Sequence, residues 1–208
     1  MVSSEEPRVL RAVDPRPART RAEILLAIER LGATGEDLTV AAIVTEAQVS
    51  RSSFYAQFRD LDDLAVQVME EILQEIRLVD VSLRSANDAL GATTTALQMF
   101  VSECQRRRGL YAAVLGGNVS GEARRRIHLA LSMNVMSAAQ YSAPRSVDPV
   151  VASSFVAAGT LAVIIDWLLD ENPLPAGQLH SQLMGVLPTW VTHSPLHDRL
   201  KPQTTVAP

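Results

Sequence analysis

Residues 38–58 read LTVAAIVTEAQVSRSSFYAQF, which is the most informative segment of the sequence. Its first half has apolar residues three and four positions apart, a spacing that places them on one face of a short helix. Thr39 precedes this helix and can act as its N-cap, since its hydroxyl can accept hydrogen bonds from free backbone N–H groups. The apolar positions are Val40, Ile43, Val44 and Ala47.

The second half predicts another short helix, which begins after Ser50 as its N-cap. Val49 lies in the intervening turn, where its apolar side chain can fill the space between the two helices. Phe54 and Phe58 are four residues apart and therefore share the inner face of the second helix. Two short helices joined by a tight turn predict a helix-turn-helix.

The positions left on the outer side of the second helix are polar. Such a helix makes a poor core, but it can lie in a DNA groove and contact phosphates and base edges. The alternative is a polar surface helix between two loops, because helix-turn-helix patterns also arise by chance. The residues left for solvent are among Arg51, Ser52, Ser53, Tyr55 and Gln57.

The wider segment from Arg19 to Leu64 adds further features in register and without gaps. They are an opening helix with Ile24, Leu25, Ile28 and Leu31, the Thr39-Val40-x-x-Ile43 start, the Ala47-x-Val49-Ser50 turn, the Phe54-Tyr55-x-x-Phe58 run and an acidic pair before Leu64. This segment resembles the DNA-binding domain of the TetR family of transcriptional regulators. The rest of the chain is similar to the family in helix pattern and length.

The sequence departs from the family pattern at three places. Gln48 occupies the turn position where the family usually has glycine, so we expect a different turn or a small strain there. Ser52-Ser53 replaces the usual Gly-Thr and keeps a hydroxyl at the second position. Leu61 replaces a frequent lysine, and Arg59 is close enough in sequence to supply that phosphate contact.

The resemblance implies an all-α fold, with an N-terminal three-helix domain carrying the helix-turn-helix and a C-terminal helical domain for ligand binding and dimerisation. It also implies a ligand-responsive regulator, most often a repressor, that binds a palindromic operator in double-stranded DNA as a homodimer. Arg51 and Ser52 are expected to reach base edges. The remaining expected DNA-binding residues are Thr39, Ser50, Ser53, Tyr55 and Arg59, with Arg19 and Arg21 as electrostatic support.

The composition of the 208 residues is that of a globular protein, with 47% hydrophobic and 4% aromatic residues. Cys104 is the lone cysteine, which excludes an internal disulfide and suits a reducing compartment. The N-terminus lacks the basic and apolar regions of a secretory signal, and no run approaches the length of a membrane span. We therefore expect a cytoplasmic protein with no membrane partner.

The net charge of −4 is the main objection to DNA binding. Residues 1–60 hold eight arginines against nine acidic residues, so the predicted DNA-binding domain is not basic as a whole. Positive charge is concentrated only in the residues that lead up to the first helix, Arg8 to Arg21. We expect modest affinity at physiological salt, which a dimer would raise by doubling the phosphate contacts.

The pattern along the chain predicts four segments: a disordered arm over 1–17, the DNA-binding domain over 18–62, a helical regulatory and dimerisation domain over 63–194, and a disordered tail over 195–208. A long helix starting near Leu61 links the two domains. Further helices are predicted over 87–107, 111–115, 121–140, 150–169 and 178–191.

A hydrophobic effector is expected among the helices over 87–140, although each candidate side chain can equally be an ordinary core residue. The candidates are Met99, Phe100, Tyr111, Met133 and Met136. The small residues of 150–169 would let another helix approach closely, and the resemblance implies that this helix lies at the dimer axis. Its candidates are Phe155, Ala158, Gly159, Ala162 and Ile165, with a buried helix inside one subunit as the alternative.

We expect no cofactor, no metal site and no catalytic residues. His193 and His197 are four residues apart, but Pro195 between them disfavours the helix that a metal pair would need. Nucleophile and phosphate-loop motifs are missing from the sequence. The alternative function is a helical binding or enzyme module in which the helix pair serves packing or protein contacts.

Overall fold

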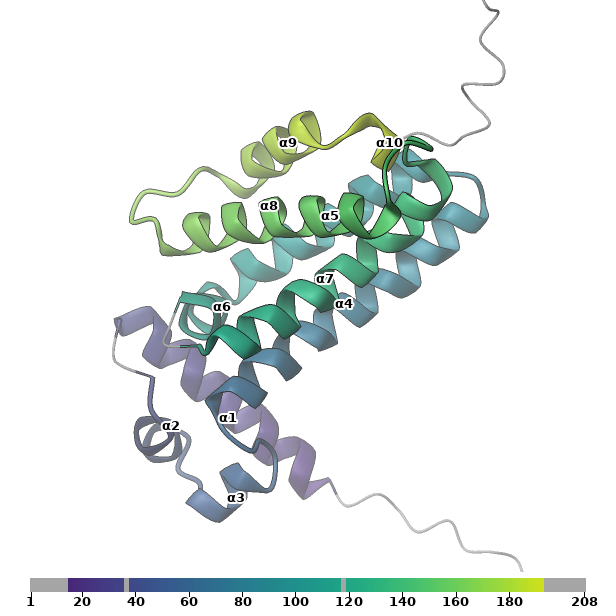
Figure 1. Ribbon diagram of the computed structural model, residues 1–208. Helices are drawn as coiled ribbons and strands as arrows, with labels where there is room; N and C mark the ends of the chain where they lie inside the picture. Colours follow the sequence, from purple (N-terminus) through teal and green to yellow (C-terminus); the bar gives the residue numbers. More distant parts are fainter. Residues whose placement is uncertain (1–14, 36–37, 117–118, 193–208) are drawn as a thin grey trace, which may run out of the picture.

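A computed structural model describes residues 15–35, 38–116 and 119–192, which fold into ten α-helices without a strand (Figure 1). The predicted all-α fold is confirmed. The helices are α1 (Arg16–Thr34), α2 (Val40–Glu46), α3 (Arg51–Tyr55), α4 (Leu61–Ser85), α5 (Ala89–Arg106), α6 (Arg108–Gly116), α7 (Gly121–Ser142), α8 (Pro149–Leu169), α9 (Ala176–Val186) and α10 (Thr189–Thr192). The expectations for residues 1–14 and 193–208 lie outside the described residues.

Helices α1, α2 and α3 form the N-terminal domain, at the end of the molecule opposite α9 and α10 (Figure 1). Helix α1 already begins at Arg16, because Pro17 is tolerated in a first turn, where the missing N–H would have no helical partner. The predicted arm over 1–17 is therefore too long by two residues. The helix ends at Gly35, whose φ of 71° lies in the left-handed region that glycine adopts without cost.

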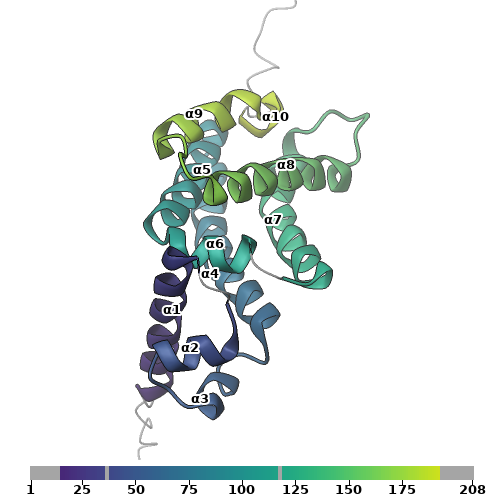
Figure 2. The same cartoon turned by 90° about the vertical axis from the view of Figure 1, so that its left-hand side faces the viewer.

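Helix α4 is continuous from the N-terminal domain into the helical body, as the sequence predicts (Figures 1 and 2). Asp60 caps its start and accepts a hydrogen bond from the Asp63 N–H at 2.7 Å. The stripe of Leu64, Val68 and Ile72 is buried against the neighbouring helices. One apolar core runs through the N-terminal helices and the helical body along α4, and the boundary expected at residues 62–63 stays a prediction.

The C-terminal body consists of α5 to α10. Helices α5 and α7 pack along α4, and α7 also packs along α8. The predicted helix over 178–191 is wrong as a single element. Proline lacks the N–H that continues a helix and clashes with the carbonyl four residues earlier, so α9 ends before Pro188 and α10 follows it.

Helix α8 differs from expectation, because it is long and apolar enough to cross a membrane, with a mean hydropathy of 1.8 and a third of its most apolar window buried. The expectation that no run approaches a membrane span is wrong on length and composition. Such a helix is weak evidence for membrane crossing, since core helices of soluble proteins pass the same test. Its exposed face carries Val151 and Phe155, which no described residue covers.

Candidate functional site

The helix-turn-helix has both predicted caps. Thr39 Oγ1 accepts a hydrogen bond from the Ala42 N–H at 3.1 Å, and Ser50 Oγ accepts one from the Ser53 N–H at 3.0 Å. In the turn, Gln48 has a φ of 54°, inside the left-handed region where side chains other than glycine are strained. The expectation of strain at Gln48 is confirmed.

Helix α3 has an inner aromatic face and an outer polar face. Phe54 of α3 and Phe58, which follows the end of the helix at Tyr55, are both buried, with their ring centroids 5.6 Å apart. The expectation of burial is confirmed for both rings, but the expectation that Phe58 belongs to the second helix is wrong. Tyr55 is 55% exposed and packs edge-on against Phe54, with 5.5 Å between the ring centroids. The two buried rings therefore anchor α3 while its other side faces solvent.

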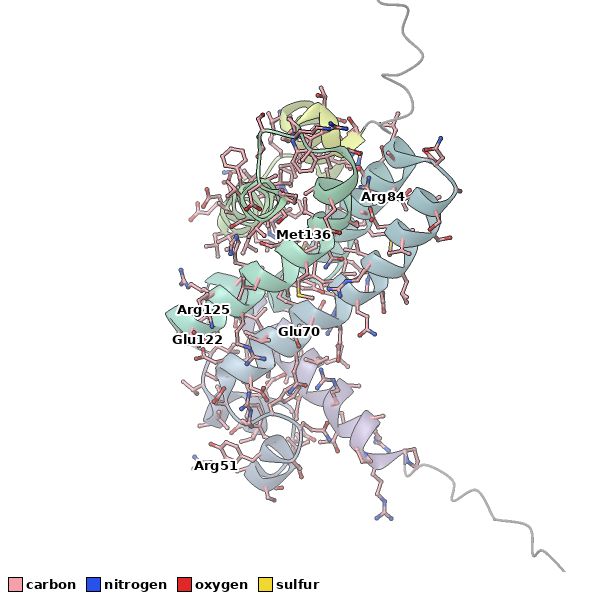
Figure 3. The ribbon with its side chains drawn as sticks, turned by 45° about the vertical axis from the view of Figure 1, so that its right-hand side comes forward. Arg51, Glu70, Arg84, Glu122, Arg125 and Met136 are labelled. Carbon is pink, nitrogen blue, oxygen red and sulfur yellow. The ribbon has the colours of Figure 1, made fainter. Side chains whose placement is uncertain are left out.

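Arg51 lies at the start of α3 and projects from the end of the molecule opposite Arg84 (Figure 3). It is exposed and makes no hydrogen bond or ion pair with any residue in the described part of the chain. Its five donors are therefore available to an outside partner, and the planar guanidinium suits bidentate pairing with guanine or phosphate.

Three hydroxyls stand beside Arg51. Ser50 Oγ lies 2.8 Å from both Ser52 Oγ and Ser53 Oγ, in addition to its capping bond. Ser52 is exposed and Ser53 half-buried. Because each hydroxyl can donate one hydrogen bond and accept two, Ser52 and Ser53 keep capacity for a phosphate oxygen or a base edge.

Arg59 follows α3 and is held by Asp63. Its backbone N–H and its guanidinium donate to the two Asp63 carboxylate oxygens at 3.0 and 2.9 Å, while the Arg59 side chain stays 73% exposed. The hydrogen bond from Arg59 holds the pKa of the nearly buried Asp63 carboxyl below its usual range, and a bond from Gln67 acts in the same direction. Arg59 is thus positioned near α3 but carries a neutralising partner.

The other predicted arginines of this domain are also paired. Arg21 contacts Glu71 and Gln67 of α4 and lies 4.6 Å from the Phe58 ring centroid, so its guanidinium joins α1 to α4 and to the segment between α3 and α4. Arg19 pairs with Glu23 at 2.9 Å and is well exposed. The structure therefore places Arg19 with Arg51 among the exposed cations and places Arg21 in a packing role.

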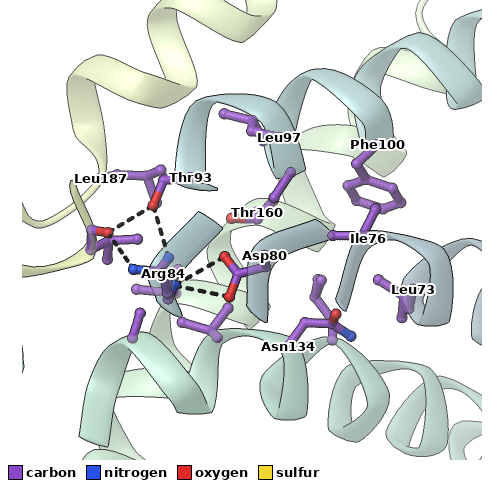
Figure 4. Close-up of a pocket in the computed structure, with 16 residues that line it drawn as sticks. Leu73, Ile76, Asp80, Arg84, Thr93, Leu97, Phe100, Asn134, Thr160 and Leu187 are labelled. Carbon is purple, nitrogen blue, oxygen red and sulfur yellow. Dashed lines mark hydrogen bonds and ion pairs between the residues drawn. The ribbon is translucent and has the colours of Figure 1, made fainter. Parts of the chain in front are cut away.

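A cavity of about 80 Å³ lies in the helical body between α4, α5, α7 and α8 (Figure 4). Most of its lining is apolar. Leu187, at the end of α9, and Val191 of α10 also line it. The lining residues are Leu73, Ile76, Asp80, Arg84, Thr93, Ala96, Leu97, Phe100, Leu131, Asn134, Val135, Ala138, Val156, Thr160, Leu187 and Val191.

A buried ion pair forms the polar end of this cavity. Arg84 Nε donates to both carboxylate oxygens of Asp80, at 3.0 and 2.9 Å. The remaining Arg84 nitrogens donate to Thr93 Oγ1 at 3.0 Å and to the Val191 carbonyl oxygen at 3.3 Å. Ser137 donates to Asp80 at 3.1 Å, so the network joins α4, α5, α7 and α10. Sequence reasoning missed it, because Asp80 and Arg84 have the spacing of any exposed helical pair.

The structure brings one of the five expected effector residues to this cavity, namely Phe100. Tyr111 is buried and lines a different, polar hollow, and burial raises the pKa of its hydroxyl. Met133 is 59% exposed, and Met99 and Met136 are half-buried outside the lining. Flexible apolar side chains carry no positional signal in one sequence, since they fill core gaps as readily as pockets.

Four of the five expected dimer residues lie on the exposed side of α8. Phe155 is 75% exposed, and Ala158, Gly159 and Ala162 continue the same face. A side chain at Gly159 would meet nothing within 4 Å. Ile165 instead turns inward, where it lines a small apolar hollow beside α6 and α7. The face is open to a second helix.

The described residues contain no cluster of three histidine, cysteine or acidic side chains that could hold a metal ion. His193 and His197 lie outside them. Cys104 is fully buried, and burial raises the pKa of its thiol, so it lacks the thiolate that a nucleophile needs.

Comparison with solved structures identifies the fold. The fatty acid degradation regulator FadR from Bacillus halodurans matches with a TM-score of 0.59 at 14% identity, over 85% of this chain and 96% of that one. The TetR transcriptional regulator from Streptococcus agalactiae matches at 0.53 and 15%, over 84% and 96%. NalD, the secondary repressor of a multidrug efflux pump in Pseudomonas aeruginosa, matches at 0.53 and 21%, over 81% and 94%.

Neither a protein-family model nor a curated protein matches the sequence. At these identities the likeness concerns the fold, which is shared over the helix-turn-helix domain and the helical body together.

Proposed function

We propose that this chain, which has the fold of the TetR-type transcriptional regulators, is itself a DNA-binding transcriptional regulator. The observation that carries the proposal is the outer face of α3. Arg51 is exposed and unpaired among the described residues, and it stands beside the hydroxyls of Ser52 and Ser53 on a helix anchored by two buried rings. This combination of a rigid inner face and free donors suits a groove of double-stranded DNA.

The proposed regulator acts as a homodimer. One five-residue helix reads too few bases for useful specificity, whereas two helices related by a two-fold axis read a palindromic operator. The apolar face of α8 supports this assembly, since Phe155, Ala158 and Gly159 have no covering partner. Pairing of two such faces removes exposed apolar surface from water. A cytoplasmic location fits this role and stays a prediction.

The proposed regulator responds to a small effector in the cavity of the helical body. Continuous α4 lines that cavity with Ile76, Asp80 and Arg84, and its first turn holds Arg59 through Asp63. A ligand that binds one arrangement of α4 more tightly than another favours that arrangement. The resulting change in DNA affinity is limited by the ratio of the ligand's affinities for the two arrangements. Release from the operator by the effector makes the protein a repressor.

Selection of bound duplexes from random DNA with the full chain tests the proposal. We expect an enriched inverted repeat, with half-sites separated by one helical turn or a multiple of it. Affinity for the enriched duplex should fall steeply as salt is raised, because phosphate contacts release counterions.

Recovery of unenriched sequences would contradict the proposal and favour a module whose helix pair serves protein contacts. Enrichment of one half-site without its inverted copy would preserve DNA binding and contradict the dimer.

A further inference from the structure

The cavity contains a buried acceptor without a partner. Asn134 on α7 uses its amide N–H₂ as donor to the Ala130 carbonyl oxygen at 3.1 Å, but its amide oxygen is buried and has no partner in the described part of the chain. Figure 4 shows Asn134 reaching from α7 toward the lining around Ile76 and Leu73. An unsatisfied buried acceptor is costly, so a ligand that supplies a donor there gains affinity.

Thr160 on α8 supplies a second polar group to the same lining. Its hydroxyl makes no hydrogen bond with the described residues, and a hydroxyl both donates and accepts. The cavity therefore offers an acceptor at Asn134 and a donor at Thr160. A ligand hydroxyl complements both groups, because it donates one hydrogen bond and accepts others.

The charged residues of the lining are not free to bind a charged ligand. Asp80 and Arg84 neutralise each other as a pair, and Arg84 also donates to Thr93 and to the Val191 carbonyl oxygen. A carboxylate or ammonium ion entering this apolar space would lose its hydration without gaining a counter-ion. The lining thus selects against charge.

The volume limits the size of the ligand. About 80 Å³ exceeds what a few waters need and is smaller than the roughly 150 Å³ apolar cavity that takes up benzene. A drug-sized ligand would have to displace several core side chains. A compact ring or short branched chain exceeds the space by less, so it needs smaller adjustments of the lining than a drug-sized ligand.

We infer that this cavity binds a compact, uncharged and mainly apolar ligand bearing a hydroxyl group, and that Asn134 and Thr160 recognise the hydroxyl. The inference rests on the proposed function, since it assigns a chemical class to the effector of that regulator.

Four matched probes test it on the full chain: phenol, toluene, anisole and benzoate. Dissociation constants are measured by ligand-detected NMR titration. We expect phenol to bind roughly 3- to 10-fold more tightly than toluene or anisole, which corresponds to one net hydrogen bond, and we expect no detectable benzoate binding. Asn134→Leu keeps the side-chain shape and should reduce the preference for phenol to within about twofold.

Thr160→Val is a second isosteric variant that should weaken phenol without weakening toluene, and it keeps the test decisive if Asn134→Leu fails to fold. Gln140→Leu makes the same amide-to-alkyl change at an exposed position of α7, and should leave all four constants unchanged. Equal binding of phenol and toluene, or a preference that survives both isosteric variants, overturns the inference.

The DNA assay separates the two claims. Sequence-specific DNA binding without a preference for phenol overturns the ligand assignment alone. A preference for phenol that depends on Asn134, in a protein that selects no DNA sequence, supports the ligand assignment and overturns the proposed function.

Discussion

Gly32 of α1 and Gly109 of α6 meet where the N-terminal helices rest on the helical body. A Cβ atom on Gly32 would overlap the carbonyl oxygen of Gly109, and a Cβ atom on Gly109 would overlap that of Glu29. Figure 2 shows α6 lying across the end of α1. Beside this crossing, Arg107 pairs with Glu29 at 3.2 Å. The two helix backbones are therefore in direct contact, and displacement of α6 must move α1.

Gly109→Ala should destabilise the protein by about 1–3 kcal/mol, because backbone atoms rather than flexible side chains must move to admit the methyl group. The free energy of unfolding in urea measures the loss. Gly177→Ala is the matched control, since a Cβ atom at Gly177 of α9 meets nothing within 4 Å. A Gly109→Ala protein as stable as the control would show that α1 and α6 separate at little cost.

Gln48→Gly should stabilise the protein by about 0.5–1 kcal/mol. The strain of a left-handed glutamine is about 1–2 kcal/mol, and the greater freedom of glycine in the unfolded chain offsets part of the gain. Thermal unfolding measures the change. Gln57→Gly makes the same replacement where φ is not positive and should destabilise. Loss of stability at both positions would mean that the turn holds Gln48 by contacts that outweigh its strain.

The start of α4 should make the protein sensitive to acid. Hydrogen bonds from the Ser120 hydroxyl and from the Ser120 N–H, the latter at 3.0 Å, lower the pKa of Asp62, as the bond from Arg59 lowers that of Asp63. A carboxyl whose pKa is lower in the folded state contributes stability above its unfolded pKa of about 3.9 and loses it as pH falls through the folded value.

Unfolding in urea between pH 7 and pH 2.5 should therefore show a fall in stability below about pH 4. Asp63→Asn should cost about 1–3 kcal/mol at pH 7 and flatten the fall, because the lost bonds involve an ionised acceptor. Glu70→Gln changes an exposed carboxylate of the same helix and should leave the profile within about 0.5 kcal/mol. An unchanged slope in Asp63→Asn would contradict the role given to this carboxylate.

Cys104 should resist thiol reagents in the folded protein. The thiol is fully buried and its pKa is raised by that burial, so both access and thiolate are lacking. Labelling with a disulfide reagent at pH 8 should be slow and should speed up in proportion to the unfolded fraction as urea is added. Rapid labelling without urea would show that α5 opens locally.

The face of α8 should hold two subunits together. Phe155→Glu places a charge at the centre of the exposed apolar stripe, where burial would leave it without a partner. Sedimentation should show a dimer for the unchanged chain and a monomer for this variant, with weaker binding to the selected duplex. Ser102→Glu on the exposed side of α5 is the control. A monomer without any substitution, or binding to lipid vesicles through α8, would contradict the assigned interface.

The sequence was most informative where structure depends on near neighbours. The caps Thr39 and Ser50, the buried pair Phe54 and Phe58, and the left-handed Gln48 all follow from residues within one or two turns. These features define the helix-turn-helix and most of its outer face. Several helix boundaries follow from proline, and the break at Pro188 follows from the same rule.

Features that depend on distant packing could not be predicted. Asn134 faces the cavity only because α4, α5, α7 and α8 enclose it, and one sequence does not reveal how those helices are rotated. Arg21 was expected to support DNA binding through its charge, yet α4 brings Glu71 and Gln67 against it. The contact between Gly32 and Gly109 spans the two domains and leaves no periodic pattern.

Arg51 is the most direct test of the account. The affinity for the selected duplex should be measured by gel shift for the unchanged chain and for the variants Arg51→Ala and Arg145→Ala. Arg145 is an exposed arginine in the loop between α7 and α8, and this loop lies far from α3 (Figure 2). Loss of a bidentate base contact costs about 1–3 kcal/mol, so Arg51→Ala should bind roughly 5- to 150-fold more weakly while Arg145→Ala binds normally. Equal binding by all three proteins would contradict the claim that the outer face of α3 reads DNA.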